Sequence, residues 1–182
     1  MSSRFAFHLR SHDARRRLPE RVFIGHKEPE TTKHVLLKFL GFALFHRDRL
    51  ELEARLHDDN IPFVPDLVQL DYTLRPAFWG ECGEVSVAKL EKLAVKVPEA
   101  EIWIVKRCPA EAEPLLRDMA RHGLRRNRYQ VAAFDAEMFD EMLAHLAPRN
   151  EVTWVAADFE PPTLQLDFNG LWFDAPFTVL KF

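Results

Sequence analysis

The segment from Val35 to Phe45 constrains the fold more than any other part of this sequence, because it is apolar except for Lys38. With 3.6 residues per turn, a helix over this segment is apolar nearly all round, and such a helix is buried on most of its sides. Pro29 to Thr32 supply a helix start, with a capping hydroxyl and an acid near the positive end of the helix dipole. The segment is far shorter than a membrane span. It therefore predicts a helix, running to about His46, that is packed inside a globular protein.

One polar stripe interrupts this helix. Glu30, His34 and Lys38 follow one another at spacings of four residues, so they share one face. Buried charges need partners, and Glu30 is placed to be the partner of the other two. Two interpretations of Glu30 stay open. It either compensates the dipole in the first turn or belongs to a functional site.

The remaining segments alternate between strand and helix patterns. Strands are predicted at Arg4–Leu9, Arg21–Ile24, Leu50–Leu56, Leu67–Asp71, Ala77–Cys82, Glu101–Val105, Tyr129–Phe134, Thr163–Phe168 and Leu171–Phe177, and further helices at Ser86–Val95, Ala110–His122 and Ala136–Ala147. Asn169-Gly170, between the last two strands, is the strongest hairpin signal of the chain. No repeat or linker divides the sequence. It thus predicts one α/β domain over residues 1–182 with a mixed sheet.

Composition excludes several classes of protein. Two cysteines in 182 residues cannot build a disulfide framework or a thiolate metal site, so we expect a reduced, cytoplasmic protein. No segment is long and apolar enough for a membrane helix. The net charge of -3 disfavours a tight general DNA-binding protein. Two arginine clusters, residues 15–17 with Arg21 and residues 121–128, are interpreted as solvated charged faces.

Two carboxylates lie where adjacent strands could bring them together. Asp66 follows Pro65 and opens one predicted strand, and Glu81 lies near the end of the next. Phosphodiester hydrolysis without a covalent intermediate needs a hard cation, and one or two carboxylates commonly hold Mg²⁺. Asp66 alone would be interpreted as a turn residue. Because a carboxylate such as Glu81 is costly to bury unless it is paired or coordinating, the two together favour a site.

The order helix, three strands, helix, strand resembles the core of the PD-(D/E)xK nuclease superfamily. More closely, the whole chain resembles the YaeQ family of small bacterial proteins, through Pro29-Glu-Thr31, Pro65-Asp66 and Trp79-Gly-Glu-Cys-Gly83, with Asp66 and Glu81 fifteen residues apart. The resemblance implies a restriction-endonuclease-like αβββαβ core, extended by N-terminal strands and a C-terminal β-hairpin. It also implies that Asp66 and Glu81 bind Mg²⁺ or Mn²⁺, with Glu30 as a supporting acid.

The catalytic lysine departs from the superfamily pattern. Its usual place, two residues after the acid, is occupied by Gly83. Lys92 matches the YaeQ pattern for this role, but on a helical wheel it lies about 160° from Leu90, whereas Lys89 lies about 100° away, at the edge of the buried face. We rank Lys92 first and keep Lys89.

Two classes of function therefore stay open. One is a metal-dependent nuclease-like hydrolase that acts on nucleic acid. The other is a binding or adaptor protein, with a protein or nucleic-acid partner, that keeps the fold and whose acids are structural remnants. The chain has no glycine-rich phosphate loop, no G-x-S-x-G motif and no histidine pair with zinc-ligand spacing.

Overall fold

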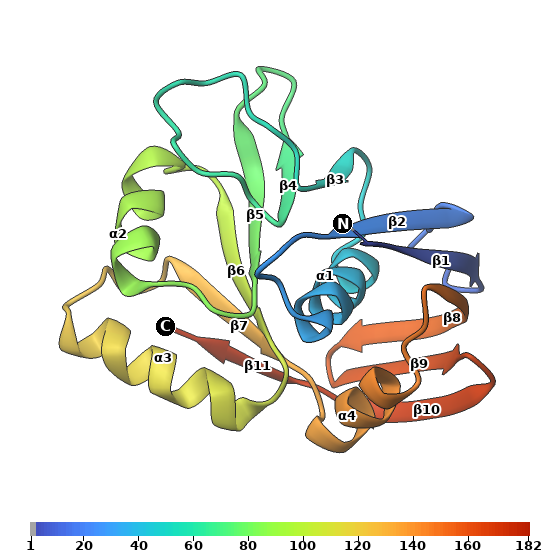
Figure 1. Cartoon of the computed structure of the whole chain (residues 1–182). Helices are drawn as coiled ribbons and strands as arrows, with labels where there is room; N and C mark the ends of the chain where they lie inside the picture. The colour runs from blue at the N-terminus through green and yellow to red at the C-terminus, as the bar shows by residue number, and fades with distance from the viewer. Residues whose placement is uncertain (1–2) are drawn as a thin grey trace.

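The computed structural model describes residues 3–182, and over this range the protein has a mixed α/β fold with four helices and two sheets (Figure 1). In chain order the elements are β1 (Ser3–Ser11), β2 (Arg21–His26), α1 (Thr32–Leu44), β3 (Leu50–Leu52), β4 (Leu67–Leu70), β5 (Pro76–Cys82), α2 (Val87–Lys96), β6 (Glu101–Lys106), α3 (Pro109–Arg121), β7 (Tyr129–Ala133), α4 (Ala136–Ala144), β8 (Arg149–Phe159), β9 (Pro162–Phe168), β10 (Leu171–Pro176) and β11 (Thr178–Lys181). None of the helices in this range is long and apolar enough to cross a membrane.

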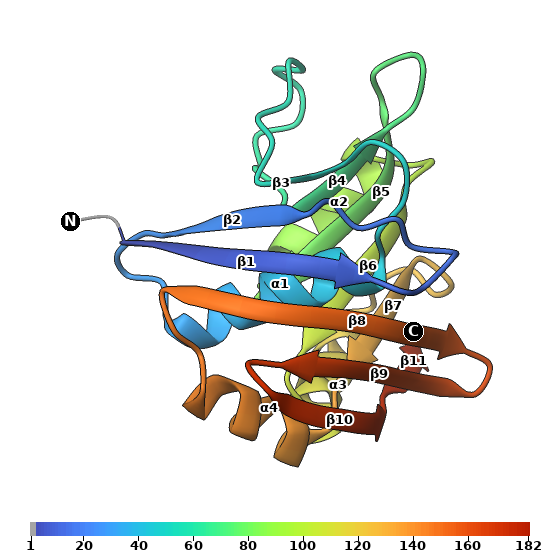
Figure 2. The same ribbon diagram turned by 90° about the vertical axis from the view of Figure 1, so that its right-hand side faces the viewer.

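Both sheets are mixed. The first has the strand order β10-β9-β8-β1-β2, in which only β1 and β8 run parallel (Figure 2). The second has the order β11-β7-β6-β5-β4-β3, with β5, β6 and β7 parallel and the outer strands antiparallel. The two are called the first and second sheets below. The prediction of an α/β fold with a mixed sheet is therefore confirmed in part: the sheets are mixed, but there are two of them.

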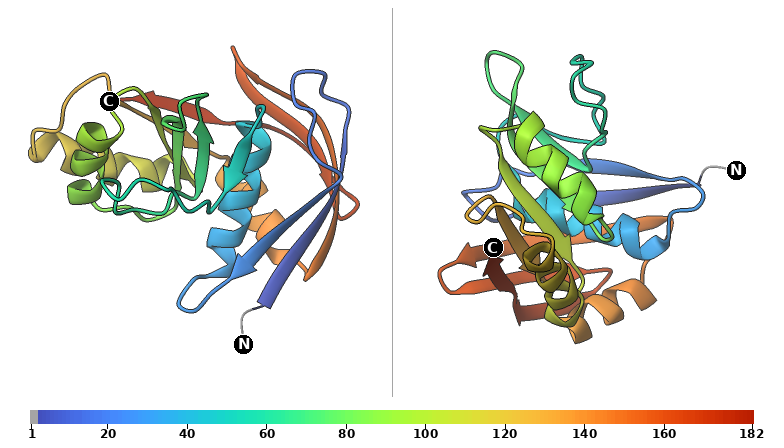
Figure 3. Two further views of the ribbon diagram at one scale, coloured as in Figure 1. Left: turned by 90° about the horizontal axis from the view of Figure 1, so that it is seen from above. Right: turned by 90° about the vertical axis from the view of Figure 1, so that its left-hand side faces the viewer.

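Helix α1 lies between the two sheets, as the view from above shows (Figure 3). Ten of its thirteen residues are buried, including Lys38, and its apolar side chains share one core cluster with residues of both sheets. The prediction of a helix buried on most sides is thus confirmed. A second cluster fills the space between the opposite face of the second sheet and helices α2 and α3. The layers are therefore sheet, helix, sheet, helices.

The start of α1 differs in one detail from the prediction. Thr31 is the N-cap, and its hydroxyl accepts a hydrogen bond from the His34 N–H. Glu30 lies one residue ahead of this cap, so the first turn contains no acid. A dipole-compensating position inside the first turn, one of the two interpretations of Glu30, is not what the structure shows.

The predicted strand Leu50–Leu56 is wrong beyond Leu52. Glu53 has a φ of 49°, in the left-handed region, which an extended strand cannot contain. The chain leaves the sheet there and returns at Asp66, whose carbonyl accepts a 2.9 Å hydrogen bond from the Glu53 N–H. Residues 53–66 therefore form a loop whose two ends meet.

Two strands were not predicted at all. β8 is the central strand of the first sheet, and β11 is an edge strand of the second. In β8 a register shift between Trp154 and Ala156 interrupts the alternation of inward and outward side chains, and this weakens the period-two signal. Helix α4 also ends three residues before the predicted Ala147.

Candidate functional site

The predicted acids meet at one end of the second sheet. Asp66 immediately precedes β4, and because Leu67 pairs with Gly80, Glu81 of β5 lies beside it. Asp66 is fixed by a 2.7 Å hydrogen bond that its Oδ2 accepts from the Cys82 N–H. Both acids therefore belong to one short antiparallel ladder, which holds them at the same edge of the sheet.

Glu81 is buried, with only 5% of its surface exposed. Its Oε1 accepts a 2.8 Å hydrogen bond from the Trp79 indole N–H, and the Lys89 ammonium lies 2.8 and 2.9 Å from its two oxygens. Burial raises the pKa of Glu81 above its ordinary value; Lys89 and Trp79 act against this rise, whereas the Asp66 charge adds to it. In the sequence, Trp79 was noted only as part of the motif Trp79 to Gly83. Its spacing of two residues from Glu81, which places both on one strand face, was the signal for this contact.

A row of polar and charged side chains continues from Asp66 along α1. His34 Nε2 lies 3.4 Å from both Asp66 carboxylate oxygens, and its Nδ1 lies 3.3 Å from Glu30 Oε1. The fully buried Lys38 ammonium then joins Glu30 Oε1 at 3.0 Å and Glu53 Oε1 at 2.9 Å. The predicted polar face of α1 thus points to the acid pair, and Glu30 reaches Asp66 only through His34.

Lys38 connects the helix to the 53–66 loop. Burial lowers the pKa of its ammonium, but the hydrogen bonds and charges of Glu53 and Glu30 outweigh burial, and the pKa is raised. Because Glu53 also bonds to the Asp66 carbonyl, Lys38 holds the end of the loop from which Asp66 projects. Sequence patterns gave no sign of Glu53, since its role depends on its left-handed backbone.

The structure separates the two candidate lysines. Lys89 lies against Glu81, whereas Lys92, which was ranked first, is exposed on α2 and makes no ion pair within residues 3–182. Gly83, in the usual lysine place, has a φ of 85° and lies beyond the end of β5. A side chain there would point toward Leu37 and His34 of α1 instead of continuing the strand face of Glu81.

The site carries an excess of negative charge. Four carboxylates (Glu30, Glu53, Asp66 and Glu81) face two lysines (Lys38 and Lys89), which leaves a charge of -2 when His34 is neutral. Within residues 3–182 no three His, Cys, Asp or Glu side chains are grouped as ligands for a metal. Mg²⁺ bound through one or two carboxylates, waters and substrate phosphate needs no such group, so Asp66 and Glu81 fit this cation and this mode of binding. Glu30 is engaged by Lys38 and His34.

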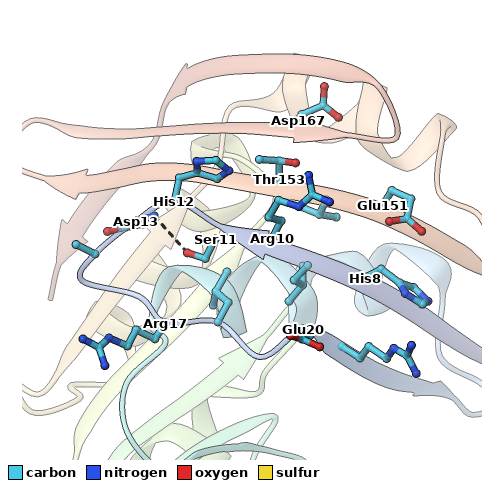
Figure 4. A pocket seen from close by; sticks show the side chains of 15 residues that line it. His8, Arg10, Ser11, His12, Asp13, Arg17, Glu20, Glu151, Thr153 and Asp167 are labelled. Carbon is cyan, nitrogen blue, oxygen red and sulfur yellow. Dashed lines mark hydrogen bonds between the residues drawn. The ribbon is translucent and has the colours of Figure 1, made fainter.

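A large hollow lies elsewhere. It measures about 880 Å³ and lies on the outer face of the first sheet, over β1 and β8 (Figure 4). Three arginines line it (Arg10, Arg17 and Arg21), and none of them makes an ion pair within residues 3–182. Four acids also line it (Asp13, Glu20, Glu151 and Asp167), so the hollow has no clear preference for anions or cations.

Comparison with known proteins places these features in a family. The family model described as YaeQ protein matches residues 8–159. The solved structure of the YaeQ protein from Xanthomonas axonopodis pv. citri is similar with a TM-score of 0.72 and 18% identity, over 100% of this chain and 99% of that one. The YaeQ protein from Pseudomonas syringae has a TM-score of 0.75 and 15% identity, over 100% of this chain and 97% of that one. At these identities the likeness shows a shared fold. No curated protein matches the chain.

Proposed function

The chain belongs to the YaeQ family, and we propose that it is a metal-dependent phosphodiester hydrolase of the PD-(D/E)xK type that acts on nucleic acid. The observation that carries the proposal is the contact between Lys89 and Glu81 beside Asp66. Two acids and a lysine converge at the ends of two adjacent strands, although the lysine comes from α2 instead of from the strand. The αβββαβ order of α1, β3, β4, β5, α2 and β6 supports the same assignment.

Each residue has a distinct role in this proposal. Asp66 and Glu81 would hold Mg²⁺ or Mn²⁺, which when bound neutralises phosphate charge and lowers the pKa of an attacking water. Lys89 would orient that water or stabilise the negative charge that develops on the phosphoryl oxygens. The Trp79 N–H fixes one oxygen of Glu81, and the Cys82 N–H fixes one oxygen of Asp66. Both carboxylates are thereby oriented before any ligand arrives.

A second function has its own supporting observation. Every acid of the site already has a partner: Lys89 and Trp79 for Glu81, Cys82 N–H and His34 for Asp66, and Lys38 for Glu30 and Glu53. Such internal pairing suits a binding or adaptor protein that keeps the nuclease fold without the reaction, with nucleic acid or another protein as its partner. The missing strand lysine at Gly83 points the same way.

A nuclease assay tests the first function against the second. Single-stranded and duplex DNA and RNA are incubated with Mg²⁺ or Mn²⁺ and the wild type, Asp66→Asn, Glu81→Gln or Lys89→Met. We expect each variant to lose about 100-fold or more in rate, the usual cost of removing one group that stabilises the transition state. Lys96→Met, an exposed lysine in the last turn of α2, is the matched control and should keep full activity.

The same assay can reject the proposal. If cleavage by the Asp66→Asn and Glu81→Gln proteins equals that of the wild type, the activity comes from a contaminant and the hydrolase is excluded. Lys92→Met decides between the lysines. A loss with this variant, together with full activity of Lys89→Met, would return the catalytic role to Lys92.

A further inference from the structure

Lys106 is a buried lysine at the carboxyl end of β6, next to the acid pair but outside it. β5 and β6 are parallel, and Glu81 pairs with Ile104. Since side chains alternate along a strand, Lys106 is on the same sheet face as Ile104 and therefore as Glu81. The spacing and rise of strands put the Cα atoms of Glu81 and Lys106 roughly 8 Å apart. This is the scale of the distance between neighbouring phosphates in a nucleic-acid strand.

The side chain of Lys106 is largely buried, and its ammonium has no close acceptor within residues 3–182; its Nζ is not fully buried, because His46 Nδ1 is the one fully buried polar atom without a partner in this range. The Lys106 side chain is only 3% exposed, and it makes no hydrogen bond within residues 3–182. The one carboxylate within 4 Å is Glu84 Oε1, at 3.8 Å, and the Glu84 side chain is 93% exposed. Burying an ammonium without acceptors is costly. Burial lowers the pKa of Lys106, the charges of Glu84 and Glu111 act against this, and Lys33 adds to it.

Neighbouring cations are already neutralised by acids of α3 and α4. Lys33 lies 2.7 Å from Glu111 Oε1, and Arg107 lies 3.0 Å from the same oxygen and 2.8 Å from Asp140. Lys106 is thus the cation in this group whose charge is least compensated. Helix α3 begins three residues later at Pro109, so its positive end also faces this region. Lys106 is therefore the cation of this group that is most available to pair with an external anion.

A hollow beside Glu84 gives access from the acid pair. It measures about 360 Å³ and is lined by residues at the start of α1, including Lys33 and His34, and by Cys82, Gly83 and Glu84 at the end of β5. His34 contacts Asp66, so the hollow adjoins the candidate site. Glu84 lines this hollow, and its carboxylate is also the one that lies 3.8 Å from Lys106. Because its side chain is exposed and makes no hydrogen bond within residues 3–182, it can swing aside at little cost.

We propose that Lys106 is part of a phosphate-binding subsite beside the Asp66–Glu81 pair, and that Glu84 occupies it until a backbone phosphate of a nucleic-acid strand displaces the carboxylate. The identity of the ligand rests on the proposed function. The subsite holds the phosphate next to the one at the acid pair, and so positions the strand without contacting the reacting atoms. Contacts to phosphate carry no sequence information, so this contribution to affinity is independent of sequence.

Two substitutions with opposite expected effects test the subsite. Binding of a fluorescein-labelled single-stranded DNA is measured by fluorescence anisotropy in EDTA, which prevents cleavage. Lys106→Met should weaken binding about tenfold and reduce the salt dependence of log K by about 0.7, the value for one phosphate contact in a single strand. Glu84→Gln should tighten binding several-fold, because it removes the competing carboxylate. Lys96→Met, which removes an exposed lysine, should leave the affinity unchanged apart from a small general charge effect.

The fold of the variants does not limit the test. Methionine matches the length of lysine and suits a buried position, and Glu84 is exposed, so both proteins should fold. Wild-type affinity in Lys106→Met, or unchanged affinity in Glu84→Gln, overturns the subsite.

Its failure can be told from failure of the hydrolase. If cleavage depends on Asp66 but binding is unaffected by the Lys106 and Glu84 substitutions, only the subsite proposal is rejected. If binding depends on Lys106 but the wild type cleaves no nucleic acid, only the hydrolase proposal is rejected.

Discussion

Replacing Lys38 by methionine separates the stabilising role of the buried charges from packing. Lys38 is fully buried, and its ammonium is shared between Glu30 and Glu53 at 3.0 and 2.9 Å. Methionine fills nearly the same volume, so the change removes the charge and leaves the core packed. Two carboxylates then lose their partner at the point where α1 meets the 53–66 loop.

The magnitude follows from the exposure of the two acids. Removing one partner of a fully buried ion pair costs about 3–5 kcal/mol, because the remaining charge is left uncompensated. The Glu30 and Glu53 side chains are 20% and 24% exposed and can regain some water, so we expect the lower part of this range or less, about 2–3 kcal/mol. For a chain of this size each kcal/mol lowers Tm by about 2–4 °C, which gives a total of about 4–12 °C.

The pH dependence of the stability loss in Lys38→Met shows whether lost charge pairing or lost packing causes it. Burial acts to raise the pKa of Glu30, but hydrogen bonds from Lys38 and the Lys27 N–H outweigh burial, and the folded pKa lies below the ordinary 4.5. A carboxyl with a lowered pKa stabilises the fold fully above its unfolded pKa and loses this contribution as pH falls through the folded value. The difference in free energy of unfolding between wild type and Lys38→Met should therefore be largest at neutral pH and shrink in acid.

Urea unfolding followed by circular dichroism, at pH 7 and at pH 3.5, measures this difference. Lys96→Met, which removes an exposed lysine, should change stability by only a few tenths of a kcal/mol. Equal stability of wild type and Lys38→Met at pH 7 would refute the argument. A loss of the same size at both pH values would show that packing, and not charge, is responsible.

Three further outcomes follow from other positions. Burial lowers the pKa of His46, whose Nδ1 has no hydrogen-bond partner within residues 3–182. The unfolded chain therefore binds the proton more readily than the folded protein, and Tm should fall as pH drops below about 6.5. His46→Gln should flatten this part of the Tm–pH curve. A Cβ added at Gly80 would lie 3.0 Å from the Cβ of Leu67 in β4, so Gly80→Ala should lower the free energy of unfolding in urea by about 1–3 kcal/mol. A Cβ added at Gly25 would have nothing within 4 Å, so Gly25→Ala should not lower it. Gly83→Lys in the Lys89→Met protein should lower stability by about 1 kcal/mol and restore no nuclease activity, because φ is 85° and the side chain points to α1; restored cleavage would contradict this geometry.

The central helix could be predicted from the sequence, but its surroundings could not. A helix that is apolar all round is predicted to be covered on every side, but the sequence does not indicate which elements cover it. Here two sheets do so, and the first depends on the parallel pairing of β1 with β8, in which Ala6 meets Arg149. The local pattern of a segment can predict a strand, as it did for β1, but it does not specify which distant segment that strand pairs with. For this reason the number of sheets was wrong while the burial of α1 was right.

In the site, the acids were easier to place than the lysine. Asp66 and Glu81 lie near the ends of strands whose pairing is set by a short connection, so their adjacency followed from the order of strands. The lysine depends on how α2 crosses the sheet, which no motif spacing specifies. The resemblance to the YaeQ pattern favoured Lys92, whereas the angle from Leu90 favoured Lys89, and it is Lys89 that contacts Glu81. A helical residue near the edge of the buried face can reach a strand end, and one on the opposite face cannot.

Two buried lysines with nearly equal burial differ in how their charge is satisfied. Lys38 has carboxylate oxygens at 2.9 and 3.0 Å, and its raised pKa follows from them, whereas Lys106 has one carboxylate at 3.8 Å and a lowered pKa. The cost of burying the first charge is offset inside the protein, so its role is fixed by the fold. Within residues 3–182 no acceptor lies within hydrogen-bond distance of the second charge, and we propose an external anion as its partner. From this contrast we infer that Lys38 supports the acid pair, and that Lys106 binds the ligand.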